Sequence, residues 1–222
     1  MKIITYTNPI IINDSKIPKS YHKFIATYGY GTYCNILNIS EPDDQVIYST
    51  FSGFDLWEFD ELFPSEALSN AIQLGTSIDG DILCFISGKE DRLFILPRHA
   101  EIILNFNNLD DVFEYYRKQY QIDTIYFEPW FNRKTEVYSL IHNNSLLDIH
   151  MIHDQFIKTF QWDYSIGEQQ PKYVIKEIGG WVRFDFVYKN SITISYQDIQ
   201  SEVYQTYLDF IKTKIEVLKN NE

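Results

Sequence analysis

The apolar residues of this chain fall into short runs separated by turn signals, and this pattern restricts the fold more than any other feature. The longest unbroken patches, such as residues 82–86, have the length of a β-strand. None approaches the roughly 18–20 uncharged apolar residues that a membrane-spanning helix requires. We therefore expect a folded protein with no membrane partner, whose core draws on the 45% of hydrophobic residues.

Helical spacing appears first at residues 18–28. Tyr21, Phe24 and Tyr28 lie on one helical face, and Gly29 is expected to end the helix. Further helices are expected at residues 65–72, 109–116, 145–160 and 198–219.

Strand signals lie between these helices. Val182, Phe184 and Phe186 alternate with polar residues, which is the period of a half-buried strand. Strands are expected at residues 33–39, 82–87, 92–97, 124–130, 173–178, 181–188 and 192–196. The pairs 82–97 and 181–196 should form hairpins. This order predicts an α+β fold: a mostly antiparallel sheet with flanking helices at residues 1–120, then a smaller α+β region at 121–222 with a hairpin and a long C-terminal helix.

The two cysteines give a prediction about compartment. Cys34 and Cys84 each lie in apolar sequence without a CxxC partner, which favours buried, reduced thiols over a disulfide or a zinc site. The N-terminus shows no small-residue cleavage site after an apolar core. We expect a cytoplasmic protein.

Charge is distributed unevenly along the chain. The formal net charge is −12, and the 65 residues between Lys23 and Lys89 contain no lysine, arginine or histidine but ten acidic residues. Such a segment argues against direct nucleic-acid binding, which needs basic residues to replace counterions. A basic protein is the complementary partner, although an acidic surplus also serves solubility.

Aromatic and acidic residues are mixed within this segment, as they are in many protein interfaces. Trp57 is the predicted anchor, and the alternative is that Trp57 and Phe59 pack beneath a loop. The predicted partner-binding residues are Asp43, Asp44, Asp55, Trp57, Glu58, Asp60, Glu61, Asp79 and Asp81.

Two glycine motifs have structural interpretations. Asp79, Gly80 and Asp81 match a metal or acid–base pair of carboxylates, but a tight turn is the simpler account, because glycine tolerates positive φ. Gly29 and Gly31 also indicate a turn, since a third glycine and a following lysine-bearing helix are missing.

Histidines offer one candidate metal site. His150, His153 and Asp154 would share a helical face, with His142 nearby, but zinc needs three or four converging ligands. We favour a hydrogen-bonded or exposed histidine pair. We predict no catalytic residue, cofactor or metal.

Three stretches of the N-terminal half resemble the SUKH superfamily, which includes the yeast cell-wall-synthesis regulators and many bacterial immunity proteins. They are residues 17–24 with 28–31, residues 74–81, and residues 93–98 ahead of the helix at 109–116. The resemblance covers about residues 15–118. The chain departs from the family pattern in having isoleucine at Ile17 and extended sequence, where members have a helix, over residues 1–13.

The resemblance implies an immunity protein that binds and neutralises a bacterial toxin domain, with a nuclease as the expected class. Two alternatives stay open: an intracellular scaffold or regulatory module, and a small hydrolase that uses carboxylates in a cleft of the C-terminal half. A neighbouring toxin gene would favour the first reading over the scaffold. A pocket with two convergent carboxylates would favour the hydrolase. The role of residues 121–222, whether a wider interface, dimerisation or a second binding module, is also open.

Overall fold

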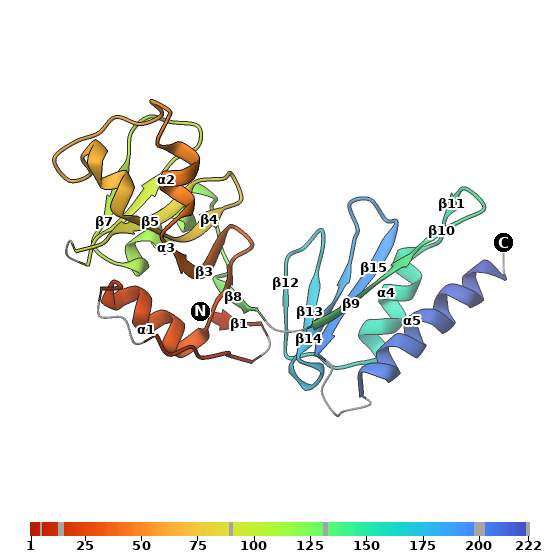
Figure 1. Ribbon diagram of the computed structural model, residues 1–222. Helices are drawn as coiled ribbons and strands as arrows, with labels where there is room; N and C mark the ends of the chain where they lie inside the picture. The colour runs from red at the N-terminus through yellow and green to blue at the C-terminus, as the bar shows by residue number, and fades with distance from the viewer. Residues whose placement is uncertain (5, 13–15, 89–90, 131–132, 198–202, 221–222) are drawn as a thin grey trace. The chain divides into compact units, whose positions relative to one another are not determined.

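The computed structural model describes residues 1–4, 6–12, 16–88, 91–130, 133–197 and 203–220. The chain divides into two compact units, Met1–Ile3 with Thr7–Trp130 and Ile4–Tyr6 with Phe131–Glu222. Each unit has its own sheet and helices, which confirms the predicted α+β class (Figure 1). The first unit extends to Trp130, past the predicted boundary at residue 120, because its last strand pairs within the first sheet.

The first unit is built on an eight-stranded sheet. Its strands are β1 (Lys2–Ile3), β2 (Gly31–Tyr33), β3 (Leu37–Asp43), β4 (Ala71–Ser77), β5 (Ile82–Ile86), β6 (Leu93–Leu96), β7 (Leu104–Phe106) and β8 (Tyr126–Pro129). They are ordered β1-β8-β2-β3-β4-β5-β6-β7, and only β1 and β8 pair in parallel. The antiparallel pair of β5 and β6 confirms the first predicted hairpin.

Helices cover both faces of this sheet (Figure 1). On one face lie α1 (Lys19–Tyr28) and α3 (Leu109–Gln119), where the ring of Phe24 is 5.1 Å from that of Phe113 and 4.9 Å from that of Phe127. On the other lie the short helix α2 (Val46–Phe51) and the 3₁₀ helix η1 (Ser65–Asn70). The sheet is therefore the middle of three layers.

The strand β5 is buried on both sides. Ile82, Cys84 and Ile86 pack in the core beneath α2 and η1. Leu83 and Phe85, which are also buried, alternate to the opposite face. A strand between two helical layers needs apolar residues at every position, which explains the unbroken apolar run.

Unit two is an antiparallel sheet with two helices on one face. Its elements are β9 (Arg133–Ser139), β10 (Ile141–His142), β11 (Ser145–Leu146), α4 (Ile149–Thr159), β12 (Tyr164–Ile166), β13 (Lys172–Ile175), η2 (Lys176–Ile178), β14 (Gly180–Phe184), β15 (Ser191–Gln197) and α5 (Val203–Lys219). The main sheet has the order β12-β13-β14-β15-β9. Phe156 of α4 and Ile211 of α5 pack on Phe184 and Ile194 of the sheet. The pair of β14 and β15 confirms the second predicted hairpin.

Several predicted boundaries are wrong. Residues 33–39 form a turn and the start of β3 instead of one strand, because Cys34 and Asn35 adopt positive φ of 50° and 58°. The helix predicted at 65–72 is η1, and the chain then enters β4.

The other differences lie in the second unit and the C-terminal helix. The helix predicted from residue 145 begins at Ile149, because the carboxylate of Asp148 accepts hydrogen bonds from the backbone of His150 and Met151. Residues 198–202 of the last predicted helix and residues 89 and 90 of the first hairpin turn lie outside the described residues.

Two predictions about burial and membranes can be compared with the structure. Cys34 and Cys84 are both buried and neither forms a disulfide, as expected. Within the described part of the chain, no helix combines the length and the apolar character that crossing a bilayer requires.

Candidate protein-binding site

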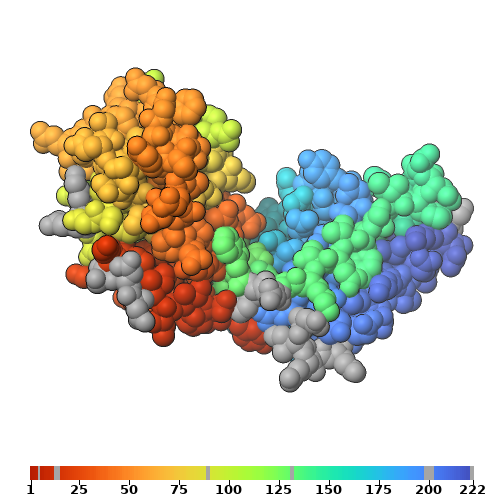
Figure 2. All heavy atoms as spheres, viewed as in Figure 1, coloured from red at the N-terminus to blue at the C-terminus, as the bar shows by residue number. Residues whose placement is uncertain are grey.

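The segment between β3 and β4 forms an outer layer of the first unit. Three buried side chains, Ile47, Trp57 and Phe63, fasten it to the sheet. In Figure 2 its orange and yellow atoms form a continuous exposed surface of this unit. The acidic residues of the segment are therefore presented on a layer with its own apolar attachment.

Trp57 is not the exposed anchor that we predicted. Its side chain is 5% exposed, its indole Nε1 donates a hydrogen bond of 2.8 Å to the carbonyl of Pro97, and the ring of Phe51 meets it edge-on at 5.4 Å. The alternative interpretation, packing beneath a loop, is confirmed for this residue. Trp57 joins the segment to the end of β6.

Other apolar side chains of the segment face outward. Phe54 is 63% exposed and Leu56 is 41% exposed, and both flank Asp55 in sequence. Leu62 is also exposed. Exposed apolar groups among charges are typical of interfaces, so these residues take the place that we had given to Trp57.

Ile102 joins this group from a distant part of the chain. The backbone N–H of Glu58 donates a hydrogen bond of 2.9 Å to the carbonyl of Glu101, and Glu58 forms a parallel bridge with Ile102. Ile102 is 65% exposed. Sequence inspection missed it, because a long-range bridge leaves no local signal, whereas Phe54 and Leu56 were visible beside Asp55.

The predicted acidic residues of this layer are all exposed, but they fall into two kinds. The carboxylate of Asp43 accepts hydrogen bonds from the backbone of Gln45 and Val46 at the start of α2. Asp60 accepts from the backbone of Leu62 and Phe63. These two carboxylates hold the segment in shape.

The remaining carboxylates of the layer form fewer hydrogen bonds. Asp44 accepts a hydrogen bond from the side chain of its neighbour Gln45. Within the described part of the chain, Asp55, Glu58 and Glu61 form no side-chain hydrogen bond or ion pair. We call Asp43, Asp44, Asp55, Glu58, Asp60 and Glu61, together with Phe54, Leu56, Leu62 and Ile102, the acidic surface.

Asp81 does not belong to this surface, contrary to our prediction. It is buried, where its carboxylate accepts hydrogen bonds from Ser77 Oγ at 3.0 Å, from Tyr116 Oη at 3.2 Å and from the backbone N–H of Arg98 at 3.1 Å. Burial, and then the charge of Asp81, raises the pKa of Tyr116, which therefore stays a neutral donor. Asp81 thus connects β4, the chain that follows β6, and α3 by hydrogen bonds.

Asp79 lies on the same turn but is exposed. Its carboxylate accepts a hydrogen bond from the hydroxyl of Tyr120, and Gly80 between the two aspartates has a φ of +86°. Ser77 and Asp81 close the turn through their backbones. The tight-turn interpretation is confirmed, and Asp79 faces α3 as well as solvent.

A cavity of about 330 Å³ lies between the segment that joins β3 to β4 and the sheet of the first unit. Its apolar walls are Phe51, Leu56, Trp57, Ile82, Leu96 and Pro97, and Gly80 and Arg98 complete the lining. The guanidinium arm of Arg98 covers Gly80, where a Cβ atom would lie 2.8 Å from Arg98 Cδ. Among the residues that the structure describes, none with a carboxylate lines this cavity.

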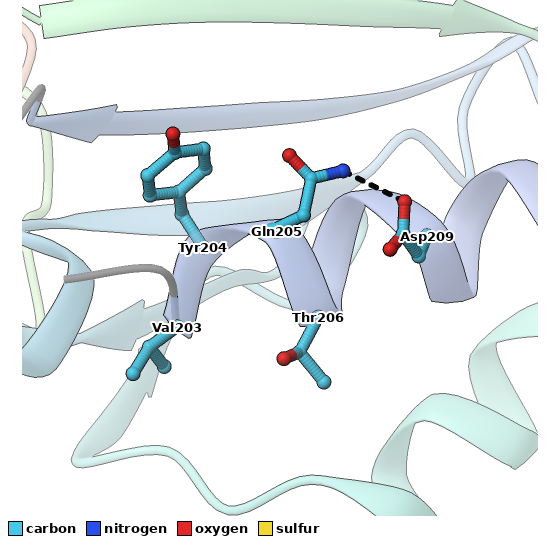
Figure 3. A pocket seen from close by; sticks show the side chains of 5 residues that line it. All are labelled: Val203, Tyr204, Gln205, Thr206 and Asp209. Atoms are coloured by element: carbon cyan, nitrogen blue, oxygen red, sulfur yellow. Dashed lines mark hydrogen bonds between the residues drawn. The ribbon is translucent and has the colours of Figure 1, made fainter.

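A second, open pocket lies at the start of α5 (Figure 3). It has a volume of about 670 Å³ and is lined by Val203, Tyr204, Gln205, Thr206 and Asp209. Gln205 Nε2 donates a hydrogen bond of 2.7 Å to Asp209. Asp209 is the one carboxylate among the described residues that line the two cavities, so these residues show no pair of convergent carboxylates of the kind that the hydrolase alternative requires.

The candidate histidine site has structural partners. His153 Nε2 lies 2.6 Å from the hydroxyl of Tyr173, and the ring of His150 stacks on Phe186 at 4.9 Å. Burial lowers the pKa of His153, partly opposed by Asp154. Within the described residues, no group of three histidine, cysteine or acidic side chains is placed to hold a metal ion. The favoured interpretation, a hydrogen-bonded histidine, describes His153.

Comparison with protein-family models, with curated proteins and with solved structures gives no match for this chain. The likeness to the SUKH superfamily therefore stands on the sequence stretches given above.

Proposed function

We propose that this protein is an immunity protein that binds a basic toxin domain stoichiometrically through the acidic surface and so neutralises it, with a nuclease as the expected class of toxin. One observation carries the proposal. Exposed carboxylates, which have no basic partner among the described residues, alternate with exposed apolar side chains on a single layer of the first unit. The likeness of residues 15–118 to a family rich in immunity proteins supports it independently.

The charge of such a surface suits a nuclease as target. A nuclease needs a positively charged groove to hold phosphate groups. An inhibitor with the opposite potential is steered to that groove, and association can reach about 10⁸–10⁹ M⁻¹s⁻¹ at low salt. The free carboxylates Asp55, Glu58 and Glu61 would supply this steering.

Charge alone rarely holds a complex together, since exposed ion pairs contribute only about 0–1 kcal/mol each. Desolvated apolar contacts slow dissociation, and the most effective ones lie near the centre of an interface. Phe54, Leu56 and Ile102 are the exposed groups that would make these contacts. The same layer thus offers both components of tight binding.

The test begins with a search of the gene neighbourhood for a large gene that ends in a toxin domain, and uses that domain as the binding partner. Association and dissociation rates are measured for the unaltered protein and for the triple variant Asp55→Lys, Glu58→Lys, Glu61→Lys. We expect the variant to associate at least about tenfold more slowly, since it reverses the steering field. Its thermal midpoint should be unchanged, because exposed substitutions usually alter stability by less than about 0.5 kcal/mol.

A matched control changes the net charge equally but elsewhere. The control replaces three exposed acidic residues outside the acidic surface, Asp123, Glu168 and Glu177, by lysine. This triple replacement should alter the association rate by less than about threefold. Equal losses in both variants would point to net charge instead of the acidic surface. If the unaltered protein fails to bind the toxin domain, the immunity function is rejected, and the scaffold alternative is favoured in its place.

A further inference from the structure

The structure also holds a cavity that the proposed binding surface borders. We infer that it is an anchor pocket, which receives one large apolar side chain, aromatic or long aliphatic, from a lysine- or arginine-rich segment of the protein partner. This inference rests on the proposed function and specifies how the acidic surface would engage its target.

The size of the cavity suits a single side chain. Its volume of about 330 Å³ lies at the lower end of the range for ligand pockets, about 300–1,000 Å³. Leu56 and Trp57, from the segment between β3 and β4, form one wall. Ile82 of β5 and Leu96 of β6 form the facing wall. A helix or strand would not fit, whereas one projecting ring or aliphatic chain would.

The walls are held before any partner arrives. Trp57 Nε1 donates to the carbonyl of Pro97, which joins the two walls directly, and Phe51 packs against the edge of Trp57. The carbonyl of Glu101 accepts a hydrogen bond from the backbone N–H of Glu58, which attaches the segment between β3 and β4 at a second point. A preorganised pocket loses little entropy when it is filled, so its contacts contribute fully to affinity.

The charges around the cavity select the occupant. The described residues of the lining include no carboxylate to pair with an inserted ammonium group, and Arg98 would repel one, so a charged group inside would be buried without a partner at considerable cost. Outside, Asp55 and Glu58 adjoin the lining residues Leu56 and Trp57 in sequence and are exposed. An apolar group flanked by basic residues matches both environments.

Leu56 gives a direct test, because it is partly exposed at the margin of the cavity. Leu56→Trp should fill the pocket, and Leu146→Trp makes the same change at an exposed leucine of the second unit, outside the acidic surface. Binding of the neighbouring-gene toxin domain is measured by calorimetry and by dissociation kinetics. We expect Leu56→Trp to dissociate at least about tenfold faster with an unaltered association rate, and Leu146→Trp to stay within about threefold.

A second measurement needs no substitution. The indole N–H resonance of Trp57 should shift when the toxin domain is added to the unaltered protein, because the occupant would lie against that ring. Tight binding by a folded Leu56→Trp variant, or an unmoved Trp57 resonance, overturns the anchor pocket. Equal losses in both tryptophan variants also overturn it.

The two proposals fail in different ways. If the triple lysine variant loses binding while Leu56→Trp retains it, the acidic surface stands and only the pocket is rejected. If the unaltered protein does not bind the toxin domain at all, both proposals are rejected.

Discussion

Single residues in this protein show how a carboxylate can be taken for a binding group when it is structural. Asp81 accepts hydrogen bonds from Ser77, Tyr116 and Arg98, three residues that lie far apart in the sequence or on different elements. Nothing local distinguishes it from exposed Asp79, two positions earlier. Trp57 was misplaced for the same reason, since the carbonyl that accepts its N–H belongs to distant Pro97.

The role of Asp81 predicts a large effect on stability. Asp81→Ala should lower the free energy of unfolding by about 2–4 kcal/mol, because it removes the acceptor of the buried Tyr116 hydroxyl and of the partly buried backbone N–H of Arg98. Urea denaturation of the purified variant measures the loss. Asp55→Ala is the matched control and should change stability by less than about 0.5 kcal/mol. Equal stability in the two variants would show that the hydrogen bonds around Asp81 contribute little.

Elements with strong local signals were predicted well. The hairpins of β5 with β6 and of β14 with β15 have continuous or alternating apolar residues around a turn, and Pro18 and Gly29 mark the limits of α1. The missed elements carry weaker signals. The strand β9 lies at the edge of its sheet and is mostly polar. The helix α2 is a single short helix, and Asp43, which accepts hydrogen bonds from the backbone at its start, was assigned to partner binding.

Capping makes a testable difference at α3. Asn108 Oδ1 accepts a hydrogen bond of 3.0 Å from the backbone of Asp111 in the first turn of this helix. Asn108→Ala should therefore cost about 1 kcal/mol of stability. Asn107→Ala, the same change one exposed position earlier, should cost less than about 0.5 kcal/mol. Chemical denaturation compares them, and indistinguishable midpoints would contradict the capping role.

The whole molecule consists of two units, each with a separate core. The strands of the first sheet all pair within residues 1–130, and the acidic surface draws only on that unit. The C-terminal unit has an independent core between its helices and its sheet. From sequence, two α+β regions were expected, but β8 was placed in the second one, since its pairing with β2 joins residues 94 to 98 positions apart, such as Tyr33 with Phe127.

This division predicts how fragments behave. A fragment of residues 1–130 should unfold in one cooperative transition and bind the toxin domain with an affinity within about threefold of the full chain, since it contains the acidic surface and the cavity. Circular dichroism and calorimetry provide the two measurements. A folded fragment with much weaker affinity would show that residues 131–222 take part in the interface.

The two kinds of carboxylate on the acidic surface have a consequence for how such a protein could change over time. Asp43 and Asp60 are committed to the backbone of their own loop, so altering them would deform the shape that a target meets. Among the described residues, the carboxylates of Asp55, Glu58 and Glu61 form no such hydrogen bonds. Under the proposed function, their charges can be rearranged to follow an altered toxin while the loop keeps its form, which separates the tuning of specificity from the maintenance of the fold.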